Sequence, residues 1–367
     1  MYTTQKDIFI LAIESSCDDT SAAVLHDRKV LSNEVASQAI HNQFGGVVPE
    51  LASRDHQKNI VAVVDAALKK AGTSLTQINA IAFTRGPGLM GSLLVGASFA
   101  KSLALARDLP LIEVNHMQAH ILAHFIDNGQ KIPGFPFLCL TVSGGHTQLV
   151  KVKDHLSMEV IGETQDDAVG EAFDKGAKIL GLPYPGGPLI DKYAQNGDPH
   201  KYKFTISNMP EFNYSFSGIK TALLYYLRDL NRAGSPRVLA DIAAGYQEAI
   251  VEVLVEKAFA AVSRYRVAAL AVVGGVSANS RLRSLLSERA AAAGIALAIP
   301  RTALCTDNAA MIAAAARGSY LAGRWASWDL EADPEMTLPS SDTISPPMGI
   351  CATRKKRSTD SVTFRRQ

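Results

Sequence analysis

The sequence predicts an α/β protein of two similar lobes around a cleft, for three reasons. The chain of 367 residues is long for one domain and suits two. Each half begins with three consecutive apolar, β-prone stretches and then alternates helical and strand patterns. The six stretches lie at residues 8–13, 22–25 and 30–35, and again at 137–142, 147–152 and 158–162. We therefore expect a duplicated α/β unit that binds ligands near the carboxyl ends of its strands.

The remaining elements follow in chain order from hydrophobic periodicity and from glycine and capping signals. In the first half they are an amphipathic helix at 49–71 ended by Gly72, a strand at 79–84, a small-residue helix at 89–106 and a strand at 111–114. In the second half the expected helices are 168–180, 190–195, 217–230, 237–265, 281–293 and 306–321, and the expected strands are 267–273 and 295–299. Thr306 or Asp307 is the expected cap of the last helix.

Composition and charge favour an ordinary globular protein of the cytoplasm. Hydrophobic residues make up 47% and charged residues 20% of the chain, and no apolar run has membrane-spanning length or the form of a signal peptide. The four cysteines form no CxxC pair, which argues against a zinc knuckle or a disulfide framework. Residues 354–367 hold six of the 37 Lys and Arg and one of the 35 Asp and Glu, so the rest carries 31 basic and 34 acidic residues. The body is therefore no basic nucleic-acid binder, and any RNA would need a local patch, the tail or a partner.

The stretch LIEVNHMQAHILAH, residues 111–124, indicates a metal site at the start of a helix. Asn115 is a good N-cap, and His116 and His120 are four residues apart, so both imidazoles lie on one helical face and can bind one divalent ion. A packed pair of core histidines is the alternative. His124 lies one turn further and is expected outside the ligand set. A zinc peptidase would need glutamate after the first histidine, where this chain has Met117.

Three turns that follow predicted strands could hold a nucleotide-like ligand. They are ESSCDDT from residue 14, SGGHT from residue 143 and GGVSAN from residue 274. Backbone N–H groups and hydroxyls in such turns can bind phosphate, although tight hairpins without a ligand are also common. The chain has no GxxxxGK[ST] and no GxGxxG at these turns, which disfavours a P-loop or Rossmann site. We expect two hairpins that face each other across a cleft. This arrangement is closer to the nucleotide site of actin, Hsp70 and sugar kinases than to a P-loop or Rossmann site.

Asp307 is the candidate for a third metal ligand, since it begins the last predicted helix in CTDNAAM. Two histidines and one carboxylate form a set with open positions that suits Fe(II) or Zn(II). Simple N-capping of the helix is the competing explanation for Asp307.

Taken together, these motifs resemble those of one enzyme family. In order they are ESSCDDT, RGPGLMGSLLVG, NHMQAH, VSGGHT, GEAFDKGAKILGL, YPGGP, SFSGIK, GGVSANSRLR and CTDNAAMIAA. They resemble the bacterial tRNA N6-adenosine threonylcarbamoyltransferases, the TsaD family, from about residue 8 to residue 323. Gln118 and Ala119 depart from the Glu-Gly found in many relatives but leave both histidines in place.

The resemblance implies a fold, an activity and a set of site residues. The fold would be the actin-like ATPase (ASKHA) fold, with lobes of residues 1–128 plus 308–345 and 129–307, and a basic tail at 346–367. The activity would be transfer of threonylcarbamoyl from threonylcarbamoyl-AMP to the exocyclic amine of the adenosine 3′ of the anticodon, in tRNAs reading codons that begin with A. The implied metal ligands are His116, His120 and Asp307, with Fe(II) favoured over Zn(II). The implied donor-binding residues are Thr141, Val142, Ser143, Gly144, Gly145, Asp174, Gly187, Asp191 and Asn279.

Mechanism and partners follow as further expectations. The donor is already activated, so no protein nucleophile is needed, but the amine must lose a proton, and Glu14 or Asp18 could accept it. The resemblance suggests tRNA, a TsaB-like paralogue and a TsaE-like ATPase as partners, and no membrane. A nucleotide-dependent phosphotransferase or a scaffold of the same fold is the alternative function, and neither would need the HxxxH pair.

Overall fold

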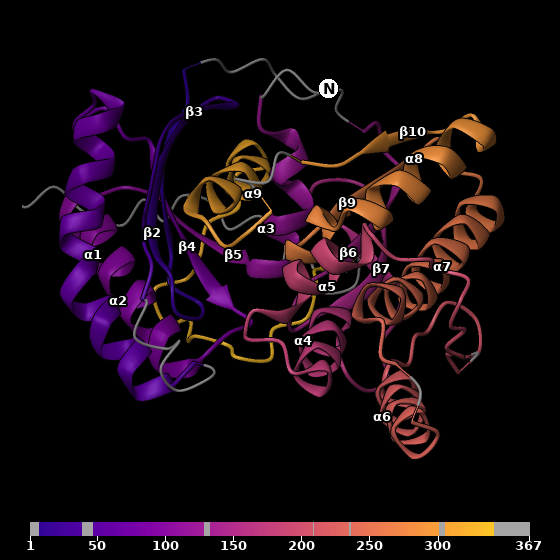
Figure 1. The fold of residues 1–367 in the computed structure, drawn as a ribbon. Coiled ribbons are helices and arrows are strands. Elements are labelled where there is room, and N and C mark those ends of the chain that lie inside the picture. Colours follow the sequence, from indigo (N-terminus) through magenta and orange to yellow (C-terminus); the bar gives the residue numbers. More distant parts are fainter. Residues whose placement is uncertain are drawn as a thin grey trace, which may run out of the picture.

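Two mixed five-stranded β-sheets form the framework of the protein in this computed structural model, which describes residues 7–38, 47–127, 133–207, 209–234, 236–300 and 305–340. The sheets lie side by side with helices between them and on their outer faces (Figure 1). The strand orders are β3-β2-β1-β4-β5 and β10-β9-β6-β7-β8. In each sheet three consecutive strands are antiparallel, and two later strands join in parallel on the other side of the first. The predicted duplication of one α/β unit is therefore confirmed.

The strands form where apolar residues run without interruption, because both faces of each sheet are covered. In β1, Ile10 and Ala12 face the interior between the sheets, whereas Leu11 and Ile13 face the outer helices. The strands of the first sheet are β1 (Phe9–Glu14), β2 (Thr20–His26), β3 (Lys29–Ala36), β4 (Ala80–Gly86) and β5 (Leu111–Asn115). Those of the second sheet are β6 (Phe137–Val142), β7 (Thr147–Val152), β8 (Met158–Glu163), β9 (Ala269–Val273) and β10 (Ala296–Ala298).

Helices cover the outer face of each sheet. The first sheet packs against α1 (Pro49–Ala71) and α2 (Met90–Arg107), on the left of Figure 1. The second packs against helices that share one apolar core with Leu138, Leu140 and Val142. These are α4 (Val169–Leu180), α5 (Gly186–Ala194), α6 (Ser217–Arg232), α7 (Leu239–Tyr265) and α8 (Ser280–Ala293). No helix in the described part of the chain is long and apolar enough to cross a membrane.

Two helices fill the space between the sheets. They are α3 (His116–Leu122), which a short 3-10 turn (Ala123–Phe125) extends, and α9 (Ala309–Leu321). Figure 1 shows both in the middle of the molecule. Their buried side chains form one apolar cluster with the inward residues of both sheets, including Ala12, Cys139 and Ala271. The polar residues at their N-termini are thereby held at fixed positions between the two halves.

The start of α9 corrects one sequence-based expectation. The helix begins at Ala309, and its cap is Asn308, whose side-chain oxygen accepts a hydrogen bond from the Met311 amide at 3.1 Å. Neither Thr306 nor Asp307 provides the cap. The neighbouring amides of Ala309 and Ala310 donate to Ser21 and Asn33 on the first sheet. Since these side chains satisfy the free N–H groups, the Asp307 carboxylate is available for another role.

The chain after α9 runs back along the first sheet. The Ala326 amide donates to the Leu111 carbonyl, and the Asp333 amide donates to the Arg85 carbonyl. Further on, the Met158 amide of the second sheet donates to the Pro339 carbonyl. These contacts place the segment beside both sheets, and the proposed division into lobes stays a prediction. The basic tail predicted at 346–367 lies outside the described residues.

Candidate metal centre and donor cleft

The two histidines of the HxxxH motif are presented by the junction of β5 and α3. The Asn115 side-chain oxygen accepts a hydrogen bond from the Gln118 amide at 3.0 Å and so caps α3 as predicted. The Asn115 amide group donates to the carbonyls of Met336 and Thr337, which ties the cap to the segment after α9. One turn of helix separates His116 and His120, and both side chains are buried. The junction therefore fixes both imidazoles on the face of α3 that points toward α9.

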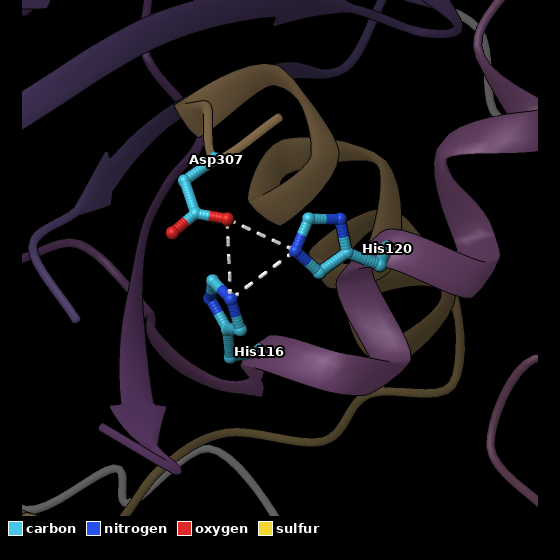
Figure 2. A group of neighbouring side chains, drawn as sticks. All are labelled: His116, His120 and Asp307. Carbon is cyan, nitrogen blue, oxygen red and sulfur yellow. Dashed lines mark hydrogen bonds and ion pairs between the residues drawn. The ribbon is translucent and has the colours of Figure 1, made fainter. Parts of the chain in front are cut away.

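Asp307 completes a group of three possible ligands (Figure 2). The Nε2 atoms of His116 and His120 lie 3.2 Å apart. The Asp307 Oδ1 atom lies 3.5 Å from the His116 Nε2 atom and 3.1 Å from the His120 Nε2 atom. Ligands about 2.1 Å from one ion are separated by about 3.0–3.4 Å in octahedral or tetrahedral geometry. The donor atoms thus already have the spacing that a divalent transition metal requires.

Glu14 at the end of β1 holds the first of these histidines. Its Oε2 atom lies 3.0 Å from His116 Nδ1 and accepts a hydrogen bond from the Thr84 hydroxyl at 2.6 Å. Its Oε1 atom accepts a hydrogen bond from the Ser16 amide at 2.5 Å. Glu14 is only 1% exposed. A carboxylate on the second nitrogen of a metal-ligating histidine fixes both the tautomer and the orientation of the ring.

The charges around His116 favour a cation at this point. Burial tends to lower the pKa of His116, but the carboxylates of Glu14 and Asp307 outweigh burial and raise it well above its usual value. Burial likewise tends to raise the pKa of Asp307, and the two histidines hold it well below its usual range. A buried pair of carboxylates that stabilises a proton on His116 would also stabilise a divalent ion bound at Nε2.

The second hairpin turn offers backbone groups to a ligand. Ser143 closes the turn, since its amide donates to the His146 carbonyl and its hydroxyl accepts from the His146 amide. Gly144 and Gly145 are exposed, and a Cβ on either would meet no atom within 4 Å. The side chains of Thr141 and Val142 are buried in the sheet, so those two residues can offer only main-chain atoms. The described residues supply no acceptor for the amides of Gly144 and Gly145.

The other predicted donor-binding residues gather around α5. The Asp174 Oδ1 atom accepts hydrogen bonds from the amides of Gly186 and Gly187, at 2.7 and 3.2 Å. The Asp191 carboxylate binds the amide and hydroxyl of Ser280. Asn279, next to Ser280, caps α8 through its side-chain oxygen and donates to Gln247 at 2.7 Å. The structure thus joins Asp174 to Gly187 and places Asp191 beside Asn279.

The first hairpin and the α5 region lie close enough to interact electrostatically. Tyr184, just before α5, is 62% exposed. Burial and then the charges of Asp174 and Asp18 raise the pKa of its hydroxyl, so carboxylates from both halves act on the same side chain. Asp18 is partly exposed, unlike Glu14. The metal-ligand set and Asp18 thus lie near the first hairpin, whereas the Gly144–Gly145 turn and the α5 region belong to the second half.

Comparison with known proteins identifies the family. The sequence profile described as "TsaD: tRNA N6-adenosine threonylcarbamoyltransferase" matches residues 29–314. The chain belongs to this family. The tRNA N6-adenosine threonylcarbamoyltransferase of Cytophaga hutchinsonii is 54% identical over 335 residues, covering 90% of this chain and 97% of that protein. The protein of the same name from Christiangramia forsetii is 56% identical over 333 residues, covering 90% and 98%. This family acts on tRNA, as the sequence motifs indicated.

Solved structures of lower identity show the same fold. The full-length HypF crystallised in a phosphate- and nucleotide-bound form has a TM-score of 0.59 at 13% identity, with 86% of this chain and 47% of that chain covered. HypF of T. kodakarensis has a TM-score of 0.58 at 14% identity, covering 86% and 48%. The predicted actin-like ATPase fold of this threonylcarbamoyltransferase family member is confirmed.

Some residues at the transferase site were missed by sequence analysis. Thr84 and Ser16 bind Glu14, and Tyr184 stands beside Asp174, but none of them was singled out. The signal for Thr84 was present: β4 pairs with β1 in parallel register, with Phe83 opposite Ile13, so Thr84 ends beside Glu14. Using it required knowing which strand lies next to β1, and no local pattern gives this.

His124 was expected outside the ligand set, and it is not one of the three clustered ligands. Its side chain is buried, with 6% exposed, and its Nε2 atom has no hydrogen-bond partner among the described residues. Burial lowers its pKa to about 4, against a small opposing effect of the Val272 carbonyl. Above pH about 6.5, the pKa of histidine in the unfolded chain, neutral His124 does not reduce the free energy of unfolding. As the pH falls from about 6.5 to 4, only the unfolded chain binds the proton, and the free energy of unfolding decreases by about 1.4 kcal/mol per pH unit.

We expect wild type to lose about 2 kcal/mol more unfolding free energy between pH 7 and pH 5 than His124→Leu does. The measurement is urea unfolding of metal-free protein at both pH values. His200→Asn, at an exposed histidine, should keep the wild-type slope. Equal losses in wild type and His124→Leu would show that His124 can be protonated in the folded protein.

Proposed function

We propose that the chain transfers the threonylcarbamoyl group from threonylcarbamoyl-AMP to the exocyclic amine of the adenosine 3′ of the anticodon, in tRNAs reading codons that begin with A. In this reaction the bond from the carbamoyl carbon to the phosphate oxygen breaks and a carbon–nitrogen bond to the adenine forms. The amine loses a proton, and AMP leaves with the bonding electrons. The observation that carries the proposal is the convergence of His116, His120 and Asp307 beside the two hairpins, in a chain of this family.

The adenylate end of the donor fits the second half of the protein. The free amides of Gly144 and Gly145 would bind the phosphate, as backbone N–H groups do in anion-binding turns. Asp174, Gly187, Asp191 and Asn279 would hold the ribose and base, with Asn279 using the amide hydrogen that Gln247 does not occupy. Such fixed donors lower the barrier by orienting the donor and by stabilising charge on the departing AMP.

The metal ligands would be His116, His120 and Asp307, and we propose Fe(II) as the native ion, with Zn(II) as the second possibility. Two imidazoles and one carboxylate leave coordination positions open, which suits either ion. When bound, the ion supplies Lewis-acid chemistry and an anchor for oxygen atoms of the threonylcarbamoyl group. Glu14 would keep the His116 ring in the ligating orientation through its contact with Nδ1.

The proton of the attacking amine needs an acceptor, for which Glu14 and Asp18 are the two candidates. Glu14 is buried and shared among His116, Thr84 and Ser16. Asp18 is partly exposed on the same hairpin. We therefore assign proton acceptance to Asp18 and the positioning of His116 to Glu14, since a general base must reach the substrate.

The proposed macromolecular partners are tRNA, a TsaB-like paralogue and a TsaE-like ATPase, which places the reaction in the cytoplasm. The packed pair α1 and α2 exposes apolar side chains, with Val61 64%, Leu105 69% and Leu94 49% exposed. Exposed apolar surface of this kind can serve a protein interface. This face is the surface we assign to the paralogue.

The alternative function is a nucleotide-dependent phosphotransferase or scaffold of the actin-like fold. Either would use the hairpin turns and the α5 region. Neither requires two histidines and an aspartate with ligand spacing, so the metal site favours the transferase.

Mass spectrometry of tRNA nucleosides tests the proposal. Unmodified tRNA is incubated with this protein, its proposed partners and freshly made threonylcarbamoyl-AMP. We expect threonylcarbamoyl-adenosine to appear only when this chain is present. Its absence with folded, metal-loaded protein would refute the transfer reaction and favour the phosphotransferase or scaffold.

A further inference from the structure

A cavity lies at the opposite end of α9 from Asp307. It has a volume of about 220 Å³ and is bordered by the β2–β3 turn, the 3-10 turn after α3, the β7–β8 turn and the last turns of α9. It therefore touches both sheets and the two helices between them. Its lining residues are Leu25, Asp27, Arg28, Phe125, His155, Ala314, Arg317 and Gly318. None of these residues belongs to the metal centre or to the donor-binding set.

The cavity brings two guanidinium groups together without a carboxylate bound to either. Arg28 and Arg317 form no ion pair with any carboxylate in the part of the chain that the structure describes. The Arg28 Nε atom donates to the Phe125 carbonyl, and the residue lines the cavity. Asp27 is close, but its two oxygens accept hydrogen bonds from the amides of Asp7 and Ile8. The positive charge of the pair is thus only partly balanced.

Two buried nitrogen atoms at this cavity also lack a partner. The Arg317 Nε and His155 Nδ1 atoms are shielded from solvent, and no described residue accepts a hydrogen bond from them. The His155 ring is held in place by Phe125 and Phe135, whose centroids lie 4.5 and 4.9 Å away. Buried donors are usually satisfied in folded proteins, so two orphaned nitrogens beside two arginines mark a region that is short of hydrogen-bond acceptors.

Electrostatic effects at His155 agree with this picture. Burial and then the charge of Arg317 lower its pKa, Asp154 opposes them, and Arg28 adds a smaller lowering effect. Burial also lowers the pKa of Arg317, where Asp27 opposes this effect and Arg28 adds a smaller lowering effect. The charges acting on His155 are therefore positive on balance, and guanidinium groups suit oxyanions.

We propose that this cavity binds a small oxyanion of the phosphate class, held by Arg28 and Arg317. A volume of about 220 Å³ is ample for a hydrated anion. A tetrahedral oxyanion offers enough acceptor oxygens for both guanidinium groups. The site is distinct from the donor cleft, where AMP would bind.

The site is connected to the metal centre through α3 and α9. Arg317 is on the helix whose N-terminal end is preceded by Asp307. The Gln118 side chain, on the helix of His116 and His120, donates to the His155 carbonyl at 2.8 Å. An oxyanion here would join the β2–β3 turn of the first sheet to the β7–β8 turn of the second. Its occupancy would therefore stiffen the packing of the two helices that carry the ligands.

Calorimetric titration with inorganic phosphate tests the proposal. The full-length, metal-loaded protein is used with saturating AMP, so that the donor cleft is filled. We expect phosphate to bind wild type, and Arg317→Gln or Arg28→Gln to weaken binding by about tenfold or more, because each removes charge-assisted hydrogen bonds. Arg289→Gln, at an exposed arginine of α8, is the matched control and should bind like wild type.

The phosphate titration either supports or overturns the proposed oxyanion site. Selective loss in the two cavity variants, with AMP affinity and the Arg289→Gln control unchanged, supports the site. Equal phosphate binding in all four proteins, or none in wild type, overturns it. Because the replacement of Arg317 could unfold α9, Arg28→Gln in the β2–β3 turn provides the decision if Arg317→Gln is unstable.

Discussion

Replacing His120 with alanine should release the metal and reduce threonylcarbamoyl transfer by about a thousandfold or more. The variant removes one of three donors, and the remaining His116 and Asp307 cannot hold a divalent ion tightly. A metal that stabilises charge by several kcal/mol corresponds to such a factor, since about 1.4 kcal/mol is tenfold in rate. Metal content by mass spectrometry and the rate of modified-nucleoside formation measure the two effects.

The protein should stay folded in this variant, because the buried His120 ring contacts the polar groups of His116 and Asp307 through its Nε2 atom, and alanine is a good helix former. Circular dichroism and thermal unfolding check the fold. His200→Ala, at an exposed histidine far along the chain, should retain both metal and activity. If His120→Ala transferred at the wild-type rate without bound metal, the metal would have no catalytic role.

The sequence located most helices and strands because each carries its own local signal, although α5 begins at Gly186, four residues before the expected start at 190. The helix at Pro49–Ala71 has both predicted ends, since Pro49 suits the first turn and Gly72 adopts a φ of 63° that favours glycine. The strands Phe137–Val142 and Thr147–Val152 also have their predicted bounds. Their apolar runs are buried on both faces, so a short continuous pattern was enough.

Contacts between segments that are distant in the sequence could not be predicted from such local signals. Asn308 rather than Thr306 or Asp307 caps α9, because Ser21 and Asn33 of the first sheet bind the neighbouring amides. Three polar residues in a row are equivalent as local capping signals. Only the packing of α9 against the sheet distinguishes them, and this packing leaves the Asp307 carboxylate beside the two histidines.

The role of Glu14 depends on another such contact, and Glu14→Gln should separate its two possible roles. Burial tends to raise the pKa of Glu14, but the charge and hydrogen bond of His116 outweigh burial and lower it. The amide of glutamine has no charge, so the His116 ring would be a weaker and less well oriented ligand. We expect metal affinity to fall by about 10–100-fold, the usual cost of removing such a partner.

Transfer by Glu14→Gln should then recover when the metal concentration is raised to saturation, because Asp18 still accepts the proton. Activity is therefore measured over a metal titration, with the dissociation constant obtained separately. Glu159→Gln, at an exposed residue of β8 paired with Lys153, is the matched control and should leave both curves unchanged. A rate that stays low at saturating metal would instead make Glu14 the proton acceptor, since a positioning residue acts only through the ligand it holds.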